Sequence, residues 1–182
     1  EKVELVKKKL IIRDWAFFDF IGRPFIEPSY KNSLLESLSK KYKILNLYII
    51  RHPLRLLESC CNKWIFFRRD NNFIYLIKGY KNYFLNASAG NICVFENFIG
   101  EPEKNLSKMC DILEIDYDNN YSDKLKDVNL TGDSTAKKSL EIHNKDSLSK
   151  KKLIKEEELN KIKNHPDFIE LMQDLKSYYQ NV

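Results

Sequence analysis

Cysteine and histidine are scarce in this chain, and long apolar runs are absent. The four cysteines lack the C-x2-C spacing of a metal site, so we interpret them as small buried side chains in a reducing, cytoplasmic compartment: Cys60, Cys61, Cys93 and Cys110. The three histidines form no metal or triad pattern, and we assign them no role: His52, His143 and His165. We expect no membrane span and no signal peptide.

The charge distribution also lacks a block of one sign. The chain carries 31 basic and 26 acidic residues, interleaved, for a net charge of +5. That pattern is typical of a solvated, mixed surface and argues against a nucleic-acid partner, while its mild basic bias suits an anionic ligand.

Short apolar strands alternate with amphipathic helices along the 182 residues, which is enough chain for one domain. This order predicts an α/β fold with a parallel sheet. Amphipathic helices are expected at 33–42, from Pro53 with a core face that includes Leu57 and Cys60 or Cys61, from Phe73 with an apolar stripe to Phe84, and at 156–163 and 167–179, the last with a face that docks on the core. Strands are expected at 10–12, 45–50 and 92–95. Ligands bind beyond the carboxyl ends of such strands. Three polar groups stand there: Arg13-Asp14, Arg51 and Glu96-Asn97.

The stretch Tyr48–Trp64, YIIRHPLRLLESCCNKW, predicts a strand that ends at Arg51 and a helix that opens at Pro53. Free backbone N–H groups at a helix start suit a phosphate. Arg51 can grip such a phosphate bidentately, and Ser59 leans back toward it from the helix. The alternative is an arginine at a sheet edge and a serine on an amphipathic helix.

The spacing Arg-x-Pro with serine eight residues after the arginine resembles the 3′-phosphate-binding segment of sulfotransferases. These enzymes use PAPS (3′-phosphoadenosine 5′-phosphosulfate). A second segment agrees, because Glu96 and Pro102 keep the family's spacing, although Asn97 replaces the usual aspartate. The resemblance implies that Phe95 lies near the adenine; a plain core phenylalanine at a strand end is the alternative.

Two further segments extend the resemblance. Asn129–Ser134 with the lysines that follow resembles the late glycine-containing loop over the 3′-phosphate, which implies roles for Gly132, Lys137 and Lys138. A solvated turn is the alternative. In the segment 10–20, Trp15 stands where the family often has a catalytic histidine. We therefore predict Asp14 as the base and Arg13 as a charge-neutralising group, with a strand-end ion pair as the alternative.

The family's first element, a strand and phosphate loop that hold the 5′-phosphosulfate, has no counterpart, and no G-x-x-x-x-G-K-[ST] motif occurs. The chain begins with glutamate, so we expect it to be the C-terminal portion of a longer protein. The resemblance implies a single sulfotransferase-like domain over 1–182, a P-loop-NTPase-like three-layer sandwich with a mostly parallel sheet, truncated at its N-terminus.

The expected activity is transfer of a sulfuryl group from PAPS to a hydroxyl or amine, with 3′,5′-ADP as the product. The acceptor is a small molecule or glycan that the sequence does not identify. Two other classes stay open: a P-loop-like nucleotide kinase fragment that uses ATP and Mg²⁺, and a non-catalytic α/β interaction domain that binds an acidic partner.

Overall fold

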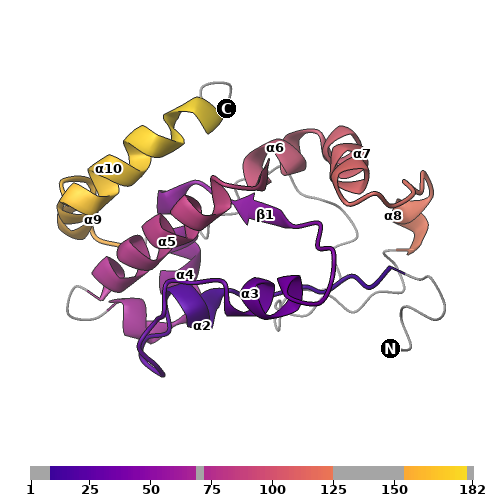
Figure 1. The fold of residues 1–182 in the computed structure, drawn as a ribbon. Helices are drawn as coiled ribbons and strands as arrows, with labels where there is room; N and C mark the ends of the chain where they lie inside the picture. Colours follow the sequence, from indigo (N-terminus) through magenta and orange to yellow (C-terminus); the bar gives the residue numbers. More distant parts are fainter. Residues whose placement is uncertain (1–8, 69–71, 125–153, 180–182) are drawn as a thin grey trace.

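A computed structural model describes residues 9–68, 72–124 and 154–179, and Figure 1 shows their arrangement. Over these ranges the chain is a mixed α/β structure, in which helices surround a small sheet of two parallel strands. This confirms the α/β class and the parallel pairing. The described residues form no third strand, so the three-layer sandwich stays a prediction.

The sheet pairs β1 (Leu47–Ile50) with β2 (Asn91–Val94), in a register that sets Ile50 opposite Val94. Both strands were predicted, the first with wider bounds and the second one residue too late, because Phe95 begins the helix α6 (Phe95–Gly100). Parallel strands need a crossover connection, and here the chain crosses through α4 (Pro53–Lys63), the 3-10 turn η1 (Ile65–Arg68) and α5 (Phe73–Ala87). The two carboxyl ends therefore lie side by side.

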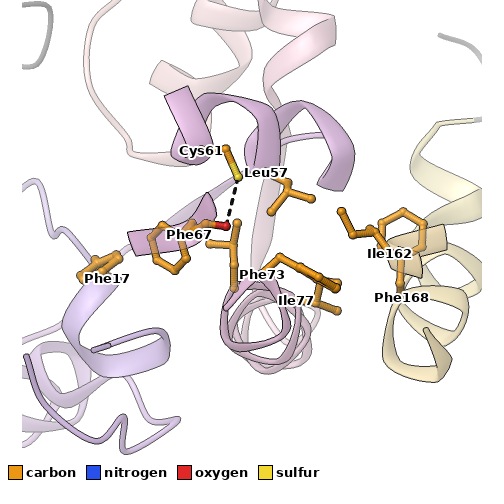
Figure 2. Packing of buried hydrophobic residues seen from close by; sticks show 9 residues of the cluster. Phe17, Leu57, Cys61, Phe67, Phe73, Ile77, Ile162 and Phe168 are labelled. Atoms are coloured by element: carbon orange, nitrogen blue, oxygen red, sulfur yellow. Dashed lines mark hydrogen bonds between the residues drawn. The ribbon is translucent and has the colours of Figure 1, made fainter. Parts of the chain in front are cut away.

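The predicted apolar stripe of α5 is confirmed, since its spacing of three and four residues places these side chains on one buried face: Phe73, Leu76, Ile77, Tyr80 and Phe84. In Figure 2 α5 is seen nearly end-on, with Phe73 and Ile77 turned toward the residues around them. Leu57 and Cys61 come from α4, and Cys61 Sγ donates to the Phe67 carbonyl at 3.5 Å. Their burial confirms the predicted core face of α4.

The C-terminal helices complete this core. They are α9 (Glu156–Lys163) and α10 (Pro166–Leu175), followed by the 3-10 turn η3 (Lys176–Tyr178). In Figure 1 α10 lies along α5. Leu171 and Leu175 are fully buried, and Lys81 of α5 bridges two carboxylates of α10, Asp167 at 3.0 Å and Glu170 at 2.6 Å. The predicted docking of the tail is confirmed.

The remaining described helices are short or lie at the periphery: α2 (Phe17–Phe20), α3 (Ser33–Ser39), α6 (Phe95–Gly100), α7 (Pro102–Ile112) and α8 (Tyr121–Lys124). The helix predicted from Ser33 ends early, and its leucines are only half-buried. Within the described residues, none of the helices combines the length and the apolar character needed to span a lipid bilayer.

The strand predicted at 10–12 is wrong. Leu10, Ile11 and Ile12 are 67%, 68% and 49% exposed, and the backbone there pairs with neither strand. An apolar triplet becomes a strand only when a neighbouring strand accepts its hydrogen bonds, and the sequence does not show whether such a neighbour exists. The segment is instead anchored by the Trp15 ring, which stacks on Phe17 at 5.1 Å.

Helix α2 rests on α5 at a glycine. A Cβ built on Gly79 would lie 2.4 Å from the Phe20 carbonyl oxygen and 2.8 Å from Ile21 Cγ1. We expect Gly79→Ala to lower the free energy of unfolding by about 1–3 kcal/mol, because the backbone of α2 must move. The higher helix propensity of alanine, about 1 kcal/mol, offsets only part of this.

Gly100 provides the matched control, because a Cβ built there meets no atom within 4 Å. Urea unfolding of both alanine variants measures the difference. Equal or higher stability for Gly79→Ala would show that α2 does not depend on this close approach.

Candidate functional site

The candidate site lies at the common carboxyl edge of the two strands. Because Ile50 pairs with Val94, the next residues, Arg51 and Phe95, emerge together at this edge. The Arg51 guanidinium lies over the Phe95 ring, with Cζ 5.0 Å from the ring centroid. A cation over an aromatic face is attracted by the ring quadrupole, so Phe95 holds the arginine in place.

The backbone of Arg51 is fixed from α5. The Tyr80 hydroxyl donates to the Arg51 carbonyl at 2.6 Å and accepts from the Arg51 N–H at 2.8 Å. Burial raises the pKa of Tyr80 far above its usual value, so the phenol keeps its proton. One buried hydroxyl therefore satisfies both backbone groups where the strand ends.

Within the described part of the chain, the Arg51 side chain has no polar partner. Its Nε is buried without a hydrogen bond, and no carboxylate of the described residues forms an ion pair with it. An unpartnered buried donor on a permanent cation costs stability, and in native structures such a group calls for an explanation. An oxyanion bound against Arg51 would satisfy it.

The sequence predicts free backbone N–H groups at the start of α4, and the structure corrects this prediction because acceptors within the protein already bind them. The His52 N–H donates to Glu96 Oε1 at 2.9 Å, Pro53 has no N–H, and the Leu54 N–H donates to His52 Nδ1 at 3.3 Å. The Glu96 carboxylate thus occupies a place where a helix start favours negative charge. The anion affinity of this edge rests on Arg51 more than on the helix N-terminus.

His52 has a role after all, as the N-cap of α4. Burial lowers its pKa, and the Arg55 charge adds to this while Glu96 opposes it. Because Nδ1 accepts from Leu54, the neutral ring carries its proton on Nε2. His52 is therefore a structural cap that must stay uncharged.

This capping predicts acid sensitivity. The folded-state pKa of His52 lies below the unfolded value of 6.5, so the unfolded chain takes up the proton first as the pH falls. Its contribution to stability is present above that pH and is lost as the pH drops through the folded-state pKa. We expect His52→Asn, a cap without a titrating group, to flatten the pH dependence of urea unfolding below about pH 6.5. Parallel profiles for the two proteins would contradict the assignment.

Tyr179 covers the same edge from the C-terminal end of the described chain. Its hydroxyl donates to Glu96 Oε2 at 3.4 Å, and its ring meets the His52 ring edge-on, with centroids 5.5 Å apart. Burial raises the pKa of the phenol, and the neighbouring Tyr80 and Glu96 add to the effect. No motif in the sequence marks Tyr179 as a site residue, since it is simply an aromatic residue after an amphipathic helix.

Ser59 stands apart from this cluster. It lies half-buried on α4, and its hydroxyl has no hydrogen bond to any described residue. The structure shows no contact between Ser59 and Arg51. The convergence of Ser59 with the arginine on one anion stays a prediction.

Arg13 and Asp14 are exposed and precede α2 without a strand behind them. Partial burial raises the pKa of Asp14, and the charge of Asp19 adds to the effect. Asp19 itself caps α3, because its carboxylate accepts from the Ser33 N–H at 2.9 Å and hydroxyl at 2.8 Å.

Gly132, Lys137 and Lys138 lie outside the described residues. Among the described residues no group of histidine, cysteine or acidic side chains is arranged to hold a metal ion, and none of the four cysteines is in a disulfide bond. Comparison of the chain with protein-family models, with curated protein sequences and with solved structures finds no match in any of the three.

Proposed function

We propose that this chain carries the 3′-phosphate half of a sulfotransferase nucleotide site and belongs to a P-loop-like α/β enzyme that transfers a sulfuryl group from PAPS. The observation that carries the proposal is the Arg51 side chain at the carboxyl end of β1, stacked on Phe95 and left with a buried, unpartnered Nε. Its position in the Arg-x-Pro…Ser spacing supports the same reading.

The residues present fit a nucleoside phosphate. Arg51 would hold the 3′-phosphate through its guanidinium fork, with the Ser59 hydroxyl as a further donor. Phe95 supports the arginine and offers its ring edge to the base. Gly132, Lys137 and Lys138 are proposed to add backbone N–H groups and positive charge from the later loop.

The acceptor side is assigned to the segment before α2. PAPS, when bound, supplies the sulfuryl group. Asp14 would take the proton from the acceptor hydroxyl as its oxygen approaches sulfur, and the raised pKa of this carboxyl makes it a better base. Arg13 would offset the negative charge near the sulfuryl group or the acceptor.

A titration with 3′,5′-ADP and with 5′-AMP tests the proposal, since the two nucleotides differ only in the 3′-phosphate. We expect isothermal calorimetry to show at least about tenfold weaker binding of 5′-AMP, because a phosphate bound by an arginine is a charged hydrogen-bond partner. Equal affinity for the two nucleotides would show that Arg51 does not bind the 3′-phosphate.

A further inference from the structure

Two contacts tie the C-terminal turn to the residues beside Arg51. The edge of the sheet presents two consecutive pairs, Arg51-His52 and Phe95-Glu96, which contact each other through the cation–π pair and the His52 N–H bond to Glu96. Tyr179 touches the second member of each pair, His52 by its ring and Glu96 by its hydroxyl. It therefore borders the place where an anion on Arg51 would lie.

The Tyr179 hydroxyl is poorly satisfied in this arrangement. Its bond to Glu96 Oε2 is 3.4 Å long, beyond the usual 2.5–3.0 Å range for such a donor. Arg51 Nε, at the same edge, has no partner. The charge of Arg51 reaches Tyr179, because it lowers the pKa of the phenol against the larger effects that raise it. Two donors without a close acceptor thus belong to the same cluster of contacting residues.

We infer that Tyr179 is a second binding residue of the Arg51 site, whose hydroxyl leaves Glu96 and donates to the bound phosphate. Glu96 keeps the His52 N–H when the phenol turns away, so the cap of α4 survives. A phosphate oxygen at ordinary hydrogen-bond distance would be a stronger acceptor for the phenol than the Glu96 carboxylate at 3.4 Å. The bound phosphate would then contact the residue that follows η3 as well as Arg51.

The packing of its neighbours limits how far Tyr179 can move. Leu171 and Leu175 anchor α10 in the core, and the Tyr178 ring packs edge-on against Phe84 at 5.7 Å. Tyr179 is the next residue, beyond these anchors, and its own hydroxyl bond is the long one to Glu96. Its ring packs against the core cluster that includes Leu171 and Leu175, so a small shift of the ring, and not release of the turn, would redirect the hydroxyl.

The inference rests on the proposed function, and Tyr179→Phe tests it with Tyr178→Phe as the matched control. The Tyr178 hydroxyl has no hydrogen bond to any described residue. Its removal therefore changes the adjacent tyrosine by one oxygen and breaks no described hydrogen bond. We expect Tyr179→Phe to weaken the binding of 3′,5′-ADP about tenfold and Tyr178→Phe to leave it unchanged.

A spectroscopic measurement on the wild-type protein separates a binding role from a structural one. In a sample with ¹³C-labelled tyrosine Cζ atoms, the Tyr179 resonance is identified by its loss in Tyr179→Phe. We expect it to shift when 3′,5′-ADP is added, and to stay in place in Arg51→Ala.

If wild-type protein binds the nucleotide while Tyr179→Phe binds equally well, or while the Tyr179 resonance does not move, the inference is overturned and the proposed function stands. If wild-type protein does not bind 3′,5′-ADP, the proposed function fails and the inference fails with it.

Discussion

Replacing Asp14 by asparagine is expected to reduce sulfuryl transfer by about 10²–10⁴-fold, the range that a positioned general base contributes. The amide keeps the shape of the side chain but cannot take a proton from the acceptor. Binding of 3′,5′-ADP should be unchanged, because the proposal assigns the nucleotide to Arg51 and its neighbours and not to Asp14. The measurement is release of 3′,5′-ADP from PAPS in the presence of a panel of phenolic and sugar acceptors.

Asp111 on α7 offers the control for charge, because it is an exposed carboxylate outside the proposed site. Asp111→Asn should turn over normally. Near-normal turnover by Asp14→Asn would remove Asp14 as the base. The exposed segment 10–15 would then be interpreted as a surface segment with no part in proton transfer.

The second large effect is expected from Arg51→Ala, which should weaken 3′,5′-ADP binding by about 100-fold. Charge-assisted hydrogen bonds are worth about 1.5–3 kcal/mol each, and a guanidinium fork makes two of them. Arg51→Lys should recover only part of the loss, since an ammonium is a point charge that offers no planar fork.

This arginine should matter much less for stability than for binding. Removing it loses the cation–π contact with Phe95, worth about 0.5–1 kcal/mol, but it also removes a buried, unpartnered Nε. We expect the free energy of unfolding to change by less than about 1 kcal/mol. A large fall in stability would show that Arg51 is a structural residue.

Arg55, on the helix that follows Arg51, is the matched control. It already pairs with Glu58 at 3.6 Å, one turn along α4. Arg55→Ala should change 3′,5′-ADP affinity by no more than about threefold, as expected for a partly exposed, paired cation. A loss equal to that of Arg51→Ala would mean that net positive charge, and not the strand-end arginine, attracts the nucleotide.

Local patterns were enough to predict the elements that frame the site. The stripe of α5 follows from side-chain periodicity, and the turn from β1 to α4 follows from an apolar run that meets Arg51 and Pro53. The parallel pairing of β1 and β2 follows from the helices between them. Each of these signals lies within a few residues of the structure that it determines.

The details of the site depend on contacts between distant residues, and the sequence does not contain them in readable form. Glu96 takes the N–H of His52 from 44 positions away, and Tyr179 reaches Glu96 from 83 positions away. The expectation of a free helix start failed because a carboxylate from the neighbouring strand end already occupies it. The strand at 10–12 failed because no described strand pairs with it.

The most direct test of the central claim is a calorimetric titration of 3′,5′-ADP into this chain and into the Arg51→Ala, Ser59→Ala double variant. We expect saturable binding by the wild-type chain that the variant loses, with both proteins folded by circular dichroism. Binding that the double variant retains would place the nucleotide elsewhere. No binding by the wild-type chain would contradict the nucleotide site and favour the non-catalytic interaction domain.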